Sequence, residues 1–69
     1  MKLSARNVLP GTVVDVKLGA TTAHVRLDLG NGVIVTSAIT NEAAQELGLK
    51  PGMKASAVVK ASDVMIGIE

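Results

Sequence analysis

The segment 23–29 alternates strictly between apolar and polar side chains, and this pattern limits the possible folds more than any other feature of the chain. Its apolar positions are separated by a histidine, an arginine and an aspartate. A period of two residues is typical of a half-buried β-strand and does not fit a helix. The chain therefore has to form a sheet with one face turned towards a core. The apolar face of this segment holds Ala23, Val25, Leu27 and Leu29.

Other apolar segments of similar length indicate four more strands, at residues 9–18, 33–39, 54–60 and 64–68. In segment 9–18 we expect Val14, Val16 and Leu18 to share a face. Segment 33–39 is apolar on both faces, which predicts either a central strand or one that a partner subunit covers.

Turn and cap residues separate these strands. The sequence Gly-Asn-Gly at 30–32 tolerates the positive φ angles of a tight hairpin. Thr40 or Asn41 can cap a short helix over 42–47, and Gly48 supplies a stop for it. Lys-Pro-Gly at 50–52 fits a turn with proline at its second position and glycine at its third.

The predicted order is three strands, one short helix and two strands. This order favours an all-β fold, a small five-stranded Greek-key barrel of the OB type with the helix between strands three and four. A chain of 69 residues without a linker or repeat is expected to form a single domain over residues 1–69.

The core of such a barrel would be thin, because the chain is 48% hydrophobic but contains no Phe, Tyr, Trp or Cys. A domain of this size buries only about 60% of its unfolded surface and often needs a disulfide, a metal or a partner subunit. Cysteine is absent and His24 is the only histidine, so we expect oligomerisation. Ile34 and Val58 are predicted to lie on the apolar outer face that partners cover.

Several classes of function lack their usual residues. A net charge of +1 and the absence of aromatic residues argue against nucleic-acid binding, which relies on basic grooves and base stacking. His24 alone does not make a zinc site, and the sequence has no nucleophile motif, so we do not expect an enzyme. Without a run of about 18 apolar residues or a signal-peptide pattern, we expect no membrane span and a cytoplasmic location.

Two short polar clusters near the ends of the chain suit a small oxyanion. The first is Ser4-Ala5-Arg6-Asn7, and the second is Lys60-Ala61-Ser62. A tetrahedral dianion only accepts hydrogen bonds, and the clusters offer a guanidinium, an ammonium, hydroxyls and backbone amides beside small residues. Thr40 adds a hydroxyl at a predicted helix N-terminus.

Spacing alone favours a plainer interpretation of the same clusters. Arg6 and Lys60 also fit the role of ordinary surface cations. Ser4 and Ser62 also fit the role of ordinary turn residues. The alternative function is then a non-catalytic oligomeric interaction module with no bound anion. A weaker alternative is a nucleic-acid-binding OB domain.

The chain as a whole resembles the molbindins, small cytoplasmic molybdate-binding proteins made of a Mop domain of the TOBE class. The resemblance spans nearly the full length in the same order. It is carried by the two clusters and by Pro10-Gly11-Thr12-Val13, Ile39-Thr40-Asn41-Glu42-Ala43, Leu47-Gly48-Leu49-Lys50-Pro51-Gly52 and Val59 before Lys60.

The resemblance implies a homohexamer, a trimer of dimers, that binds molybdate or tungstate between subunits for molybdenum storage or homeostasis. It implies no catalytic cofactor. By position, Ser4 and Arg6 match ligands from one subunit, and Lys60, Ala61 and Ser62 match ligands from another. Thr40 is a further ligand, and Ala61 acts through its backbone N–H. Some members have a serine where this chain has Ala43. A second kind of anion site lies near the threefold axis in this family.

Overall fold

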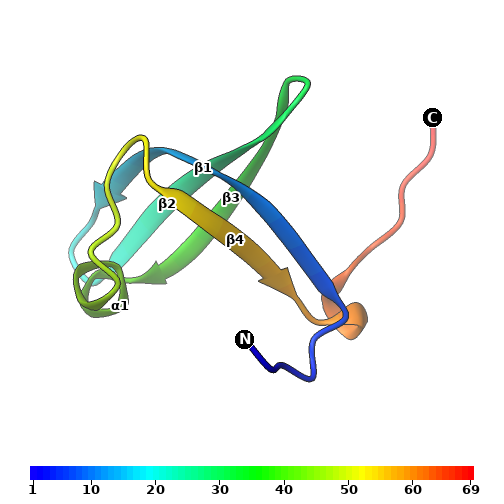
Figure 1. Cartoon of the computed structure of the whole chain (residues 1–69), viewed down its shortest axis with the longest axis horizontal. Helices are drawn as coiled ribbons and strands as arrows, with labels where there is room; N and C mark the ends of the chain where they lie inside the picture. Colours follow the sequence, from blue (N-terminus) through cyan, green and yellow to red (C-terminus); the bar gives the residue numbers. More distant parts are fainter.

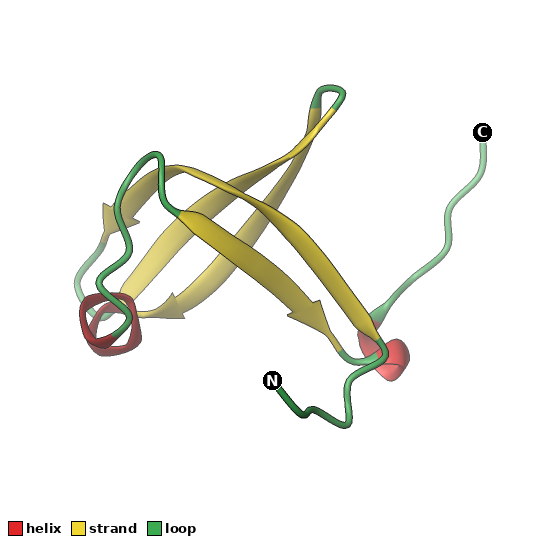
Figure 2. Cartoon of the chain, in the orientation of Figure 1, coloured by secondary structure: helices red, strands yellow, loops and turns green.

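The computed structural model describes all residues from 1 to 69 and has an all-β architecture with one short α-helix (Figures 1 and 2). Its four strands form one curled antiparallel sheet in the order β3-β2-β1-β4. The helix lies between β3 and β4, where the sequence predicted it. The elements are β1 (Asn7–Leu18), β2 (Thr22–Gly30), β3 (Val33–Thr40), α1 (Asn41–Glu46), β4 (Lys54–Val59) and a 3-10 turn, η1 (Ala61–Asp63).

The long strand β1 organises the sheet because its two halves have different partners. Its first half pairs with β4, from Asn7 opposite Val59 to Thr12 opposite Lys54. Its second half pairs with β2, ending at Leu18 opposite Ala23. Gly11 lies where β1 passes close to β2, since a Cβ atom there would come within 2.7 Å of the backbone oxygen of Asp28. The sheet therefore bends across β1 rather than lying flat.

The faces of β1 differ from the prediction because the strand has a β-bulge between Val13 and Asp15. Val14, Val16 and Leu18 were expected to share a face, but Val13 is buried in place of Val14, which is exposed, and Leu18 at the end of the strand is exposed as well. At a bulge, two residues of one strand lie opposite a single residue of the neighbouring strand. The alternation of buried and exposed side chains therefore shifts by one position. Val16 still packs against the core, as predicted, because it lies beyond the shift.

The core is as thin as the composition indicated. Only five residues of the chain are buried, all of them apolar: Val13, Ala23, Val25, Leu27 and Ala44. Three of them lie on β2, whose alternation of buried and exposed residues matches the predicted faces. With so few buried side chains, most of the apolar residues of the isolated chain remain partly or largely exposed to water.

The predicted turns and helix cap are confirmed. Gly30, Asn31 and Gly32 all have positive φ angles, of 100°, 52° and 78°. Thr40 caps α1, since its Oγ1 accepts a hydrogen bond from the Ala43 N–H at 3.0 Å. Asn41 instead begins the helix and ties it to the loop before β2, because its Nδ2 donates to the Gly19 carbonyl at 2.8 Å.

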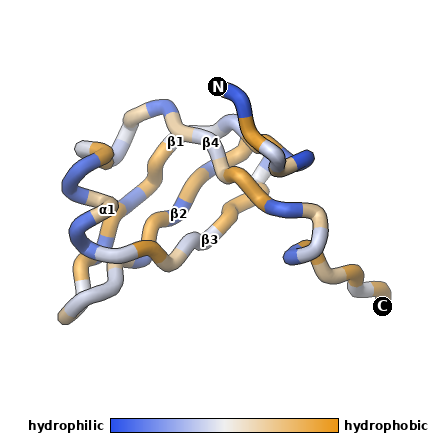
Figure 3. The backbone as a smooth tube through the Cα atoms, turned by 90° about the horizontal axis from the view of Figure 1, so that it is seen from below, coloured by the Kyte–Doolittle hydropathy of each residue, from blue (hydrophilic) through white to orange (hydrophobic).

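The predicted fifth strand is absent from the sheet of the single chain. After η1, residues 64–69 run away from the sheet in an extended path without secondary structure (Figures 1 and 3). A strand requires a ladder of backbone hydrogen bonds, and this segment has no neighbouring strand to pair with. β4 also ends at Val59, one residue before the predicted end.

Strand β3 is an edge strand, although its sequence is apolar on both faces. It is therefore not the central strand that was one of the two predictions. It pairs with β2 on one side only. Ile34 on its outer face is 44% exposed. Its second apolar face is therefore not buried by the chain itself, so the prediction of a central strand is wrong, and coverage by a partner subunit stays a prediction.

Candidate anion-binding site

The two polar clusters lie at one end of the β1–β4 pair. Asn7, the first residue of β1, stands opposite Val59, the last residue of β4. Arg6 and Lys60, the residues just outside this pair, therefore flank the same end of the ladder. The chain folds this way because the apolar runs that follow Arg6 and precede Lys60 form antiparallel strands in register.

Asn7 fastens this end of the sheet with its side chain. Its Nδ2 donates a hydrogen bond to the Val59 carbonyl at 3.1 Å. This bond fixes the exit of β4 against the entry of β1, and so fixes the spacing of the two clusters. We assigned no role to Asn7 from the sequence. The only sequence signal for this role was a side-chain amide at the boundary between a polar cluster and a strand.

The turn after β4 arranges the second cluster. Ala61 to Asp63 form η1, in which the Asp63 N–H donates to the Lys60 carbonyl at 2.8 Å. Lys60 itself has extended backbone angles and makes no side-chain capping bond. Lys60, Ala61 and Ser62 thus follow directly after the end of β4, which pairs with the start of β1, and all three are exposed.

The cations at this end are free of carboxylate partners. The chain has two arginines, and Arg26 is occupied by the only salt bridge, in which its Nε donates to both Asp15 carboxylate oxygens at 3.1 Å. That hydrogen bond lowers the pKa of Asp15 and raises the pKa of Arg26. Arg6 and Lys60 have no such pairing, so their donors remain available to an anion.

Thr40 lies at the other end of the molecule. It ends β3 opposite Thr22 and starts α1, whereas the clusters lie beside η1 (Figure 1). Within one chain the register of β1 with β4 therefore places the two clusters at the same end of the sheet and leaves Thr40 apart. The Thr40 oxygen accepts the capping bond from Ala43, which leaves its O–H free to donate.

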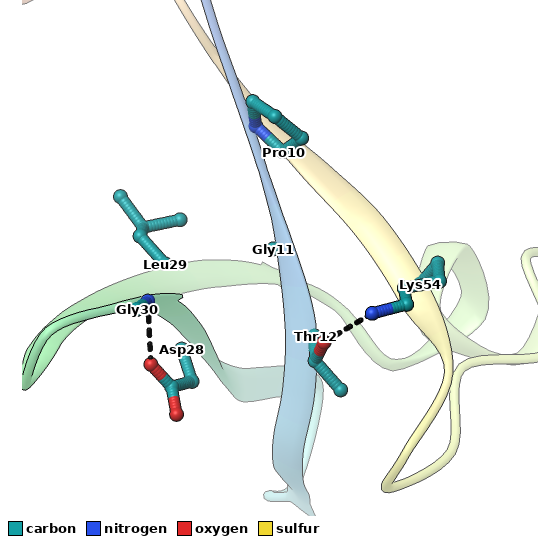
Figure 4. Close-up of a pocket in the computed structure, with 7 residues that line it drawn as sticks. All are labelled: Pro10, Gly11, Thr12, Asp28, Leu29, Gly30 and Lys54. Atoms are coloured by element: carbon teal, nitrogen blue, oxygen red, sulfur yellow. Dashed lines mark hydrogen bonds between the residues drawn. The ribbon is translucent and has the colours of Figure 1, made fainter.

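A separate pocket of about 340 Å³ lies near the middle of β1 and does not include any of the predicted residues (Figure 4). In it, Lys54 Nζ donates to Thr12 Oγ1 at 3.2 Å, and Asp28 accepts the Gly30 N–H at 2.7 Å. The Lys54 ammonium and the Asp28 carboxylate both have hydrogen-bond partners within the chain, and a carboxylate repels an anion. This pocket therefore does not form a site of donors alone. Nor does the structure contain a group of three or more His, Cys, Asp or Glu residues suited to a metal ion.

The sequence matches a family model. Residues 3–66 fit the TOBE domain. The chain belongs to the TOBE domain family. Neither helix of this TOBE domain has the length and hydrophobicity needed to cross a bilayer.

Relatives of this TOBE domain share its whole length. It is 44% identical over 69 residues to a probable molybdenum-pterin-binding protein of Haemophilus influenzae, with 100% of both chains covered. It is 48% identical over 66 residues to molybdenum-pterin-binding protein 2 of Clostridium pasteurianum, with 96% of this chain and 97% of that protein covered. The molbindin resemblance is thus confirmed, and the chain belongs to the family of these molybdenum-pterin-binding (Mop) proteins.

Solved structures have the same fold. MopII from Clostridium pasteurianum superposes with a TM-score of 0.89 at 46% identity, over 97% of this chain and 100% of that chain. The cytoplasmic molybdate-binding protein ModG, in a form with molybdate bound, superposes with a TM-score of 0.93 at 54% identity. That match covers 100% of this chain and 49% of ModG.

Proposed function

We propose that this protein binds molybdate or tungstate, for intracellular molybdenum storage or homeostasis, and that it is not an enzyme. The observation that supports this proposal is that two cations without a carboxylate partner, Arg6 and Lys60, flank the same end of the sheet. The names of the relatives, and a structural neighbour with molybdate bound, support the choice of anion. The bound species is a ligand, and no catalytic cofactor is involved.

The proposed site is built from Ser4, Arg6, Thr40, Lys60, Ala61 and Ser62. Arg6 offers a planar fork of donors, and Lys60 a compact charge that offsets the dianion. Ser4 and Ser62 add hydroxyl donors, and Ala61 leaves its backbone N–H open to the ligand. Asp63 is the one carboxylate in the adjoining turn, and it takes no part as a ligand because an anion would repel it.

We propose that the site lies between subunits of a homohexamer, a trimer of dimers, in which each subunit is the single domain 1–69. A twofold contact makes the same surface patch of two copies face each other. If the end carrying both clusters lies at such a contact, Arg6 of one copy approaches Lys60 of the other. Thr40, at the far end of its own chain, reaches an anion only from a further subunit.

We also propose a cytoplasmic location, the setting named for the ModG neighbour. The exposed apolar residues on the outer surface, including Ile34 and Val58, support the oligomer. In this protein they would be covered by neighbouring subunits rather than by solvent.

Calorimetric titration with molybdate tests the site. A hydrogen bond to a charged group contributes about 1.5–3 kcal/mol. We therefore expect Arg6→Ala and Lys60→Ala each to weaken molybdate binding by about 10- to 100-fold while the oligomer persists by native mass spectrometry. Lys17→Ala, which removes an exposed lysine at the opposite end of β1, is the matched control and should bind normally. Unchanged affinity in both site variants would refute the assignment.

Two further arms of this experiment complete the test. Asp63→Asn should bind molybdate at least as well as the parent, since it removes a negative charge. Mixing the Arg6→Ala and Lys60→Ala chains should restore part of the binding, because some sites then receive an intact arginine from one chain and an intact lysine from another. An oligomer that binds none of molybdate, tungstate, sulfate or phosphate would instead be the interaction module.

A further inference from the structure

The hairpin between β2 and β3 has the sequence Gly30-Asn31-Gly32 and projects beyond the rest of the sheet (Figure 1). Gly30 pairs with Val33, so Asn31 and Gly32 alone form the loop. Asn31 has a φ of 52° and is the only residue other than glycine with a positive φ. Consecutive positive φ angles are typical of a type I′ turn, for which Asn-Gly is a preferred pair. The tip of the hairpin is therefore an asparagine with a glycine on either side.

No hydrogen bond holds the Asn31 side chain, whereas the other two asparagines of the chain are anchored. Asn7 Nδ2 donates to the Val59 carbonyl. Asn41 Nδ2 donates to the Gly19 carbonyl, and its Oδ1 is buried. Asn31 is exposed, and nothing lies within 4 Å of where a Cβ atom would stand on either flanking glycine. Its side-chain amide is thus the one that moves freely in water.

The residue that follows each asparagine decides how its side-chain amide can react. Gly32 follows Asn31, whereas Val8 and Glu42 follow the other two asparagines. A glycine has no Cβ atom, so its backbone nitrogen can approach the preceding side-chain carbonyl without a clash. A valine or glutamate side chain hinders that approach. Asn31 therefore combines the least restrained amide with the least hindered neighbour.

We propose that Asn31 is a site of spontaneous deamidation in the folded protein, with water as the co-reactant. The backbone nitrogen of Gly32 loses its proton to hydroxide and attacks the side-chain carbonyl carbon of Asn31. A C–N bond forms, the bond to the side-chain nitrogen breaks, and that nitrogen leaves as ammonia after taking up a proton from water. Water then opens the five-membered succinimide ring at one of its two carbonyls. The products are aspartate and isoaspartate, and no oxidant or reductant takes part.

Local opening of the hairpin allows this ring closure. A closed type I′ turn restrains the backbone rotation that brings the two reacting atoms together. The tip has few contacts to hold it closed, and the pairing beside it is irregular, with a register shift between Asp28 and Gly30. Segments with exposed backbone and few buried contacts open at a small cost in free energy. The reactive conformation is therefore reached without unfolding of the sheet.

Either product changes the hairpin. A carboxylate replaces a neutral amide, so the formal net charge of the chain falls from +1 to 0. The new charge lies near Asp28 in sequence, whose carboxylate accepts the Gly30 N–H at 2.7 Å (Figure 4). Isoaspartate also routes the main chain through its Cβ atom, which adds one atom to a two-residue loop. We expect the end of the β2–β3 ladder at Val33 to fray in this form.

Peptide mapping of aged protein tests the proposal. The assembled parent protein is kept warm at mildly alkaline pH for several weeks, digested and analysed by mass spectrometry with fragmentation. We expect the mass gain of an acid over an amide to accumulate at least tenfold faster at Asn31 than at the internal controls, Asn7 and Asn41. Labelling with an isoaspartyl methyltransferase should mark the same peptide. Equal rates at the three asparagines would overturn the proposal, as would a reaction confined to protein unfolded in urea.

Two variants separate the chemistry from the fold. Asn31→Gly keeps a turn that type I′ geometry tolerates and removes the amide. Ion-exchange chromatography should show an acidic species in the aged parent and at least tenfold less of it in Asn31→Gly. Gly32→Ala keeps the amide and hinders the attack, so it should slow the reaction at Asn31 at least tenfold. An acidic species that forms as fast in Asn31→Gly as in the parent would place the reaction elsewhere and overturn the proposal.

Discussion

Strand β2 and the segment 64–68 both have apolar residues at every second position, but their environments are opposite. In β2 the residues between them are polar, whereas in the segment they are Met65 and Gly67. In β2 the apolar positions Ala23, Val25 and Leu27 are 0%, 3% and 4% exposed. In the segment, Ile66 and Ile68 are 88% and 94% exposed. The difference is one of partners, since β2 has a strand on each side and the segment has none.

The comparison shows what a period-two pattern reports. It indicates a face that must be covered, but it does not indicate which chain covers it. β2 is joined to its neighbours by short turns, so its own chain buries it. The segment follows η1 and runs away from the sheet, so its own chain does not bury it (Figure 1).

The largest effect is expected in β2, where burial is already complete within one chain. Leu27→Ala leaves a cavity beside Val13 and Val25, and we expect it to lower the free energy of unfolding by about 2–5 kcal/mol. Denaturant unfolding followed by far-ultraviolet circular dichroism measures this, since the chain has no aromatic fluorophore. Met65→Ala, at a position that is 92% exposed, is the control. A Leu27→Ala chain of unchanged stability would contradict the assigned core.

A second substitution asks whether the segment is equivalent to β2 once its partner is present. In the proposed oligomer, Ile66→Ala should cost less than Leu27→Ala, about 2 kcal/mol per chain, because a contact between subunits is less enclosed than the core. An exposed side chain would change stability by no more than about 0.5 kcal/mol. Unfolding of the parent should also depend on protein concentration, as it does when subunits bury each other's residues. A change within the exposed range would show that the segment is never buried.

Most of the fold was predictable because its signals are local. Alternation located the strands, Gly30 to Gly32 located the hairpin, and Thr40 located the start of the helix. The bulge was not predictable, because Val13 and Val14 are identical side chains and only pairing with β2 decides which one is buried. The position of residues 64–68 was missed for a related reason. It depends on a neighbouring strand that the single chain does not provide.

The candidate site was predictable as a set of residue types rather than as a place. Arg6 and Lys60 were recognisable as donors, and the family resemblance assigned them to one ligand. Their position at the same end of the sheet follows from the register of β1 with β4, which no local pattern specifies. Asn7, which fixes that register at its end, was missed because an amide beside a strand has many possible partners.

The smallest expected effect concerns the polar face of β2, which needs no partner chain. Arg26 on this face donates to Asp15, and this hydrogen bond lowers the pKa of the Asp15 carboxyl. A carboxyl whose pKa is lower in the folded state stabilises the fold above its unfolded pKa, and this contribution is lost as the pH falls through the folded value. Asp15→Asn should therefore reduce the thermal midpoint slightly at pH 7.

The midpoints of Asp15→Asn and of the parent should converge as the pH falls below about 3.9, the usual aspartate pKa. Asp28→Asn is not a suitable control, because Asp28 caps the Gly30 N–H, so Glu46→Gln at the exposed end of α1 is used instead. Added salt at pH 7 should also shrink the difference, because the pair is exposed and its attraction is screened. A difference that persisted in acid would mean that Asp15 acts through packing rather than through its charge, and the outer face of β2 would then not be the solvated half of the alternation.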